Sequence, residues 1–365
     1  MESENCRKSI VMLPHLAHGH ISPFLELAKQ LAKRSFVVHL CSSPINLASI
    51  KSRVHENDHV QLVEFHLPYS PELPPCYHST NGLPYSLIPT LEQAFEKAAP
   101  VFIDILRDIE PDLVIYDFKP SWPAEVALSL NVPAVYFAVT AAAASCLVAH
   151  LCKRAGEEFP FPEVGGVSID AQKLPEPVLK AFRENVLCFE RSCSLAFIRS
   201  FREVEEKYIN FLPDLVQKSI IPIGPLVHDP TDNEDDEMKN IIKWLDRKER
   251  SSVLFVCFGS ENYLSAEQVI EMSNALEIAK CAFIWSVRLV VEIGVGMAIA
   301  RNTEGKFKRE EIANVINKVL AEESGEGVRR KAREIKLKIE GKGEDDLDKA
   351  AEELKQVCSK KTQAY

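Results

Sequence analysis

Apolar residues in the first half of the chain follow two alternating patterns. Short continuous apolar runs predict strands buried on both faces, at residues 9–14, 36–41, 113–118 and 134–139, and an alternating run predicts another at 61–67. Between these runs apolar residues recur with a helical period, which predicts helices over 21–34, 91–106 and 122–130. Strands that alternate with helices favour an α/β fold with a doubly wound parallel sheet.

Two segments rich in proline and aromatic residues interrupt this alternation. They cover residues 68–89 and 157–166 and predict irregular loops. In a parallel α/β fold, long loops over the strand ends are where substrates are contacted.

An acidic segment, DPTDNEDDE at residues 229–237, is the clearest boundary in the chain. Residues of this kind cannot build a hydrophobic core. We therefore predict four parts: an N-terminal domain over 1–228, a linker over 229–240, a second domain over 241–345, and a C-terminal helix and tail over 346–365.

The second domain has fewer predicted strands than a doubly wound domain needs. Apolar runs predict strands at 253–258 and 283–287, with a third near 295–299, and helical patterns cover 266–279 and 310–322. A nucleotide-binding domain of this class usually has about five or six strands. Two charged amphipathic helices end the chain, and we expect the last to dock on another element through an apolar stripe at Leu347, Ala350, Ala351, Leu354 and Val357.

Charge and composition narrow the possible partners. The 365 residues carry a net charge of −10 without a Lys/Arg-rich stripe, which argues against a nucleic-acid partner. The apolar stretch over 282–300 is interrupted by Arg288 and Glu292, so we expect no membrane span. The polar N-terminus lacks a signal-peptide pattern, and ten scattered cysteines without a CxxC pair fit reduced thiols, so we expect a cytoplasmic protein.

Three histidines, His15, His18 and His20, lie in the loop PHLAHGH after the first predicted strand. This loop belongs at the carboxyl edge of the sheet, where ligands bind, and Gly19 allows a ligand to approach closely. His20 is a candidate general base. The alternatives are a structural loop and a metal site, although no nearby Asp, Glu or Cys completes a ligand set.

Asp117 ends the apolar strand LVIYDF. A carboxylate in that position must be paired or hydrogen-bonded. It either caps the next helix near Ser121 or pairs with His20 across neighbouring strand ends, where it would fix the tautomer of the imidazole. Such a dyad suits removal of a proton from a hydroxyl.

Two glycine-containing turns follow in the second half. The turn Phe258-Gly259-Ser260 lies between a strand and a helix and is either an ordinary turn or a phosphate contact. The pair Gly294 and Gly296 lacks the third glycine of a dinucleotide-binding loop.

Several long segments resemble the plant UDP-dependent glycosyltransferases of secondary metabolism. They include VMLPHLAHGHISPFLELAKQLAKR, PDLVIYDFKPSWPAEVALSLNVPAVYF, IIPIGPLV and WLDRKERSSVLFVCFGSENYLSAEQVIEMSNALEIAKCAFIWSVR. The resemblance implies a GT-B-like fold of two Rossmann-like domains, the C-terminal one truncated. The segments LCSSPINLASIK and SPELPPCYHSTNGLP are similar to the branch that extends a flavonoid, terpenoid or apocarotenoid glycoside.

The resemblance also implies roles for individual residues. His20 would deprotonate an acceptor hydroxyl, with Asp117 as its partner, and the oxygen would attack the anomeric carbon of UDP-glucose with inversion. It implies a monomer that uses UDP-glucose as co-substrate and needs neither a cofactor nor a metal. The expected donor-binding positions are Gly19, Thr140, Gly259 and Ser260.

The signature box of that family is absent. It begins with Trp-x-Pro-Gln, passes through His-Cys-Gly-Trp-Asn-Ser and binds the UDP-sugar, whereas Trp122, Trp244 and Trp285 all belong to other segments. We therefore expect an impaired or inactive UDP-glucosyltransferase with a poorly stable C-terminal half. The alternatives are a non-catalytic acceptor-binding protein and a truncated product of splicing or of a faulty gene model.

Overall fold

The computed structural model describes residues 7–55, 58–162, 164, 174–224, 226, 236–249, 252–257, 265–286, 308–320, 322–339 and 343–362. The chain divides into two compact units. Unit 1 comprises Met1–His228 together with Gly341–Tyr365, and unit 2 comprises Asp229–Glu340.

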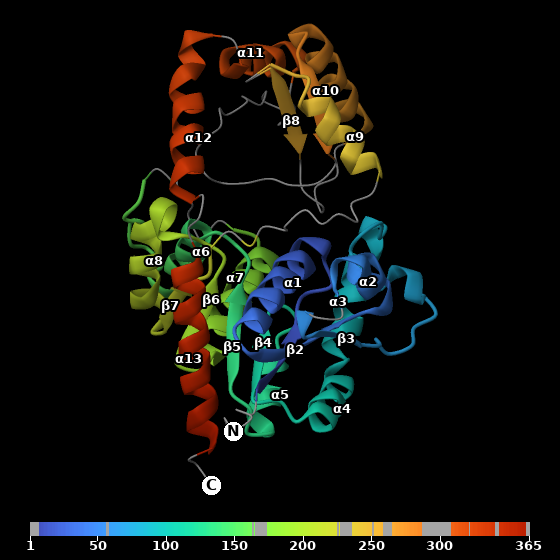
Figure 1. The fold of residues 1–365 in the computed structure, drawn as a ribbon, viewed down its shortest axis with the longest axis vertical. Coiled ribbons are helices and arrows are strands. Elements are labelled where there is room, and N and C mark those ends of the chain that lie inside the picture. The colour runs from blue at the N-terminus through green and yellow to red at the C-terminus, as the bar shows by residue number, and fades with distance from the viewer. Residues whose placement is uncertain are drawn as a thin grey trace, which may run out of the picture. The chain divides into compact units, whose positions relative to one another are not determined.

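Unit 1 is built on a seven-stranded parallel sheet in the order β3-β2-β1-β4-β5-β6-β7 (Figure 1). Strand β1 lies between β2 and β4, and Ile10 is opposite both Val38 and Leu113. The strand order therefore reverses between β1 and β4, which makes this the topological switch point of the sheet. The strands are β1 (Lys8–Leu13), β2 (Phe36–Ser42), β3 (Val60–Glu64), β4 (Leu113–Tyr116), β5 (Ala134–Ala138), β6 (Leu195–Ile198) and β7 (Ser219–Pro222).

Helices cover both faces of this sheet. Successive strand residues point to opposite faces, so Val135 and Phe137 join one core while Tyr136 joins the other. The first core is covered by α1 (His18–Lys33), α2 (Pro44–Ile50) and α13 (Glu344–Thr362). The second is covered by α3 (Ile88–Glu96), α4 (Ala99–Ile109), α5 (Pro123–Ser129), α6 (Ala142–Lys153), α7 (Glu176–Arg191) and α8 (Arg202–Val216). Short 3-10 turns lie at η1 (Lys51–Arg53), η3 (Pro75–Tyr77) and η4 (Tyr85–Leu87).

Two helix predictions in unit 1 are wrong in detail. The single helix expected over 91–106 is two helices, and Pro100 lies in the first turn of the second, where a missing N–H costs no helical hydrogen bond. The helix expected from residue 21 begins at His18, which places His20 in its first turn.

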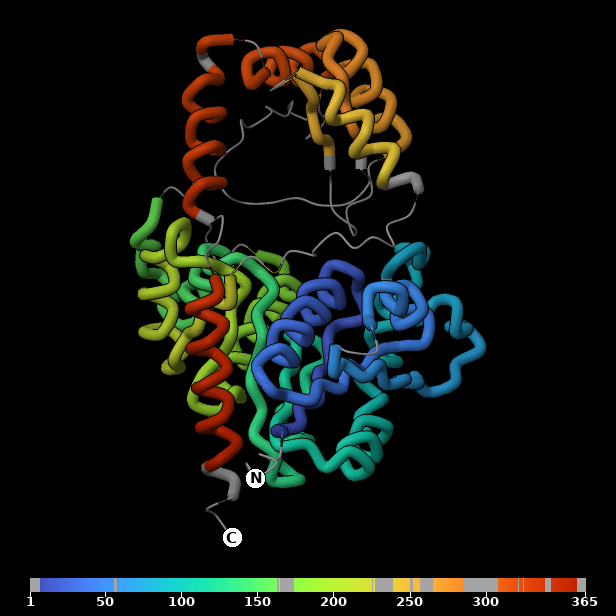
Figure 2. The backbone as a smooth tube through the Cα atoms, viewed as in Figure 1, coloured from blue at the N-terminus to red at the C-terminus, as the bar shows by residue number. Residues whose placement is uncertain are grey.

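Helix α13 returns to unit 1 and contacts α1 and β7 (Figure 2). Its side chains Leu347, Ala350 and Leu354 are buried in the core shared with α1. No helix from the β5–β7 segment joins this core among the described residues, because α6, α7 and α8 all lie on the other face. Helix α13 therefore supplies the cover that this part of the sheet needs.

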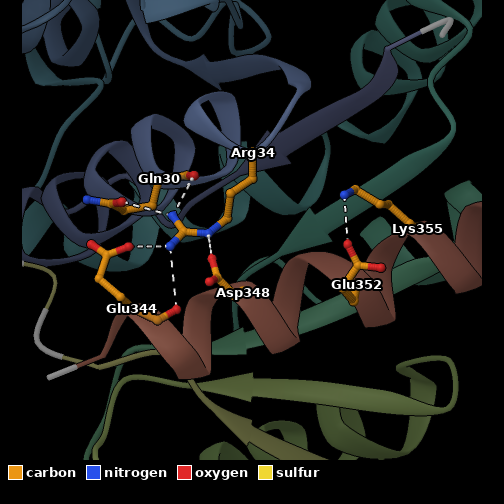
Figure 3. A network of polar contacts seen from close by, with 6 residues as sticks. All are labelled: Gln30, Arg34, Glu344, Asp348, Glu352 and Lys355. Atoms are coloured by element: carbon orange, nitrogen blue, oxygen red, sulfur yellow. Dashed lines mark hydrogen bonds and ion pairs between the residues drawn. The ribbon is translucent and has the colours of Figure 1, made fainter.

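A polar network joins α13 to the end of α1 (Figure 3). Arg34 is the C-terminal cap residue of α1, and its Nε donates to Asp348 Oδ1 at 2.7 Å. The same guanidinium pairs with the Glu344 carboxylate. Lys355 and Glu352 pair only along α13, at 2.8 Å. The network thus connects the helix that carries His20 to the last helix of the chain.

Unit 2 has a two-stranded parallel sheet of β8 (Val253–Cys257) and β9 (Ala282–Ser286) in its described part. A small core around Val256, Met272 and Ile312 holds the strand β8 against two helices. Helix α9 begins inside the segment predicted as a linker, and residues 295–299 lie outside the described part. The helices are α9 (Asp236–Leu245), α10 (Ala266–Ala279), α11 (Arg309–Leu320) and α12 (Glu326–Ile339), with the turn η6 (Glu323–Gly325).

Candidate active site

The candidate site lies where β1 and β4 end. The last register pair of these strands is Leu13 opposite Tyr116, so Pro14 and Asp117 leave the sheet side by side. The chain after β1 turns into α1, whose first turn carries His20. Residues 97 positions apart in sequence therefore meet at the switch point, which is the usual ligand site of such sheets.

His20 and Asp117 form a hydrogen-bonded pair. His20 Nδ1 lies 2.7 Å from Asp117 Oδ2. The Asp117 side chain is 1% exposed, whereas that of His20 is 16% exposed. Because an ionised carboxylate only accepts, His20 Nδ1 is the donor of this hydrogen bond. The carboxylate thus holds a partly exposed imidazole through its Nδ1 side.

Backbone amides hold the Asp117 carboxylate in place. Oδ2 accepts from the backbone N–H of His15 at 2.9 Å, and Oδ1 accepts from that of Phe118 at 2.7 Å. Helix α5 begins at Pro123 without a side-chain cap. The alternative that Asp117 caps the helix near Ser121 is therefore wrong, since its oxygens are bonded to the loop after β1 and to its own strand end.

His15 packs beside this pair as a neutral imidazole. Its ring meets the His20 ring edge-on, with centroids 5.4 Å apart, and also contacts Phe95 and Phe118. Burial, and secondly the nearby His20, lower the pKa of His15 to about 3. Its Nδ1 atom is buried without a hydrogen-bond partner in the described part of the chain. His15 therefore adds no charge next to His20 in the physiological range.

A short polar rim continues from the dyad. The Phe118 ring lies 5.3 Å from the His20 ring, centroid to centroid, and Lys119 Nζ lies 5.8 Å from the centre of the Phe118 ring. Lys119 pairs with Glu92 on α3. The sequence patterns did not indicate that Lys119 and Glu92 lie near the dyad, whereas the position of Phe118 directly after Asp117 was a signal for its contact with His20.

The predicted donor-binding residues are placed as follows. Gly19 is exposed in the first turn of α1, next to His20. Thr140 follows β5 at the same carboxyl edge of the sheet, and its Oγ1 lies 3.0 Å from Ser145 Oγ. Gly259 and Ser260 lie outside the described residues, so their donor-binding role stays a prediction.

The described part of the chain lacks metal-binding clusters and membrane-spanning helices. There, no three His, Cys, Asp or Glu side chains come together as a possible metal site. None of the helices described combines the length and the apolar character that a membrane crossing requires.

A doubly wound sheet with a His–Asp pair at its switch point, followed by a second parallel α/β unit, defines a GT-B-type protein. The family described as "Glycosyltransferase, N-terminal domain" matches residues 7–228. The chain is similar to "UDP-glucosyltransferase 29" of Panax ginseng, with 44% identity over 99% of each chain. It is also similar to "Beta-D-glucosyl crocetin beta-1,6-glucosyltransferase" of Gardenia jasminoides, with 34% identity over 97% of this chain and all of the relative. The chain belongs to the plant UDP-glycosyltransferase family.

A solved structure gives the same fold. The Glycyrrhiza uralensis protein UGT73P12, complexed with glycyrrhetinic acid 3-O-monoglucuronide, matches with a TM-score of 0.80 and 17% identity over 98% of this chain and 97% of that one. The alignment with the ginseng relative spans 442 positions and this chain has 365 residues, so at least 77 positions have no residue of this chain opposite them. Because the alignment covers 99% of both chains, these unmatched positions of the ginseng relative fall within its sequence and not at either end.

Proposed function

We propose that unit 1 binds a hydroxylated plant small molecule, or its glycoside, and activates one hydroxyl for transfer of glucose from UDP-glucose. The hydroxyl proton passes to His20 Nε2 as the oxygen forms a bond to the anomeric carbon. The bond from that carbon to the diphosphate oxygen breaks, and UDP leaves with the electron pair. Attack opposite the leaving group inverts the anomeric centre.

The observation that carries this proposal is the 2.7 Å contact between His20 Nδ1 and Asp117 Oδ2. An imidazole that accepts a proton at Nε2 must carry its own proton at Nδ1. A buried carboxylate that accepts a hydrogen bond from Nδ1 fixes this tautomer and stabilises the imidazolium that forms. Asp117 is itself held by two backbone N–H groups, so the orientation of the imidazole is set before an acceptor binds.

We propose further that transfer is impaired on the donor side. The sequence contains no His-Cys-Gly-Trp-Asn-Ser segment, and many positions of the ginseng relative have no counterpart here. Without residues to clamp the nucleotide, little binding energy remains to orient the anomeric carbon towards His20. Large apolar side chains, Phe255 and Phe283, are exposed in unit 2, which supports the proposal that this unit has low stability.

The second candidate function is acceptor binding without transfer. It is favoured by the same absence of the donor box, combined with a complete sheet and dyad in unit 1. In this case the chain would hold the small molecule and leave it unchanged.

A transfer assay separates the two candidates. The full chain is incubated with UDP-glucose and with aglycone and monoglucoside acceptors, and UDP release and glucoside formation are measured. If transfer occurs, His20→Ala should lower its rate about 10²- to 10⁴-fold, as loss of a general base does. His66→Ala, which changes an exposed histidine outside the site, is the matched control.

Binding measurements complete the test. Acceptor-dependent thermal stabilisation without UDP binding in calorimetry would support the second candidate. Transfer that survives His20→Ala at an unchanged rate would refute the role of the dyad. A chain that binds neither acceptors nor UDP would refute both candidates.

A further inference from the structure

Helix α7 is bonded to both residues that flank Asp117, and both bonds involve Cys188. The Tyr116 hydroxyl donates to the Cys188 carbonyl oxygen at 2.6 Å. The Cys188 thiol donates to the Phe118 carbonyl oxygen, with Sγ 3.5 Å from that atom. Cys188 and Tyr116 are each 1% exposed, so water does not compete for the bond between them. One residue of α7 therefore holds the chain both before and after the carboxylate.

We infer that Cys188 is a positioning residue, which keeps the Asp117 carboxylate in the orientation that the His20 imidazole requires. This inference rests on the proposed function, because it takes the His20–Asp117 pair as the group that activates the acceptor hydroxyl. It extends the site to a helix that contributes no side chain to the pair itself.

The thiol is linked to the imidazole through the backbone of one residue and through one carboxylate. The Phe118 N–H donates to Asp117 Oδ1 at 2.7 Å, and the carbonyl of the same residue is the acceptor of the Cys188 thiol. The other oxygen, Asp117 Oδ2, contacts His20 Nδ1 at 2.7 Å. A change in the backbone at Phe118 would therefore move the carboxylate that holds the imidazole.

The Cys188 thiol stays protonated, as a donor must. Burial, and secondly the nearby Asp117 carboxylate, raise the pKa of Cys188 to about 12. The sulfur thus keeps its proton at neutral pH. A thiol is a weak donor, so we expect a moderate effect on the geometry of the pair when it is removed.

The loop after β4 is also anchored further along the chain, at Ser121. Glu96 accepts from the backbone N–H of Ser121 at 3.1 Å, and Arg191 Nη1 donates to the Ser121 carbonyl at 2.7 Å. These bonds do not involve Cys188. Loss of the thiol should therefore shift the backbone next to Asp117 without detaching the loop from α3 and α7.

The test measures the hydrogen bond of His20 directly, by nuclear magnetic resonance on the full chain with labelled histidine. In the unmodified chain the Nδ1 proton of His20 should exchange slowly with water, because it lies in a hydrogen bond to a buried carboxylate. Cys188→Ala and Cys188→Val should each speed this exchange about threefold or more, the factor that a weak hydrogen bond contributes. Valine fills the space that alanine leaves empty, so a similar effect of both variants assigns it to the lost donor and not to a cavity.

Cys146→Ala is the matched control. Cys146 on α6 is 0% exposed, and its Sγ lies 3.1 Å from the carbonyl oxygen of Tyr208 on α8. The change removes the same kind of buried contact between a thiol and a carbonyl, but neither neighbour of Asp117 takes part in it. The thermal unfolding temperature should fall by a similar amount for Cys146→Ala and Cys188→Ala, whereas only Cys188→Ala should change the exchange at His20.

Tyr116→Phe decides the matter if neither Cys188 variant folds. It removes the other bond of Cys188, whose carbonyl oxygen still accepts from the Ser192 N–H at 3.2 Å, and it should also speed the exchange. A slow Nδ1 proton that none of these variants changes, or that Cys146→Ala changes equally, would overturn the positioning role and leave the proposed function standing. If His20 of the unmodified chain carried no proton at Nδ1, the pair itself would be absent, and the proposed function would fail together with this inference.

Discussion

Removal of the Asp117 carboxylate should cost both stability and the orientation of His20. Asp117→Ala leaves the backbone N–H groups of His15 and Phe118 without their acceptor. A buried N–H group left unsatisfied costs about 1 to 3 kcal/mol. The Phe118 amide is only partly buried and water can replace that bond, so we expect a loss of about 2 to 4 kcal/mol in the free energy of unfolding of unit 1.

Hydrogen exchange measured by mass spectrometry on β1 and β4 peptides reports this loss without requiring the whole chain to unfold in one step. Glu205→Ala is the matched control, since the Glu205 carboxylate accepts from the backbone N–H groups of Ala142 and Ala143 but contacts no histidine in any described bond. Both variants should lose protection. Only Asp117→Ala should change the tautomer of His20, read from its imidazole nitrogen shifts. An unchanged tautomer, or a loss below about 0.5 kcal/mol, would refute the reasoning.

Three further outcomes are expected from other parts of unit 1. The pKa of His15 is about 3 in the folded chain and about 6.5 in the unfolded chain. The free energy of unfolding should therefore decrease as the pH is lowered from about 6.5 to about 3. At pH 5 the loss is about 2 kcal/mol, and His15→Phe should remove it from the measured pH profile. Leu354→Ala should cost about 2 to 5 kcal/mol in urea unfolding, whereas Leu128→Ala, at a 74% exposed position of α5, should cost less than about 0.5 kcal/mol. Asp348→Asn, which removes the negative charge that pairs with Arg34 at an exposed site, should cost at most about 1 kcal/mol, and the cost should shrink in concentrated salt.

The dyad could be predicted because it depends only on strand order. The apolar runs that became β1 and β4 are buried on both faces, and such strands are visible as continuous hydrophobic stretches. The residues that directly follow two neighbouring parallel strands lie at the same edge of the sheet. His20 and Asp117 therefore needed no knowledge of side-chain packing to be brought together.

Other parts of the fold had weaker signals. Strands β6 and β7 were not predicted; both are short, and β7 begins with an exposed serine and ends in a proline, while α2 spans only Pro44–Ile50. The separation of α3 from α4 depended on the effect of one proline within a continuous helical pattern. Such features are decided by tertiary packing more than by local pattern.

The Glu92–Lys119 ion pair beside Phe118 could not be predicted from sequence patterns for a similar reason. Glu92 lies on α3 and Lys119 in the loop after β4, 27 residues further on. Their contact depends on how α3 packs over the sheet and on the path of the loop, neither of which has a sequence period. A lysine and a glutamate taken alone would be assigned to a solvated surface.

The position of α13 explains how unit 1 can keep its sheet and the His20–Asp117 pair while the donor box is missing. Helix α13 fills the face over β5 to β7 with Leu354 and its buried neighbours, yet it comes from the last part of the chain. An internal deletion leaves this helix in the chain. A truncation at the start of unit 2 would remove the helix and expose Phe137 and Phe197. The large cost expected for Leu354→Ala is therefore also a test of whether acceptor binding depends on the retained C-terminal segment. If Leu354→Ala left both stability and acceptor affinity unchanged, unit 1 would be complete without α13, and keeping that segment would have no structural role.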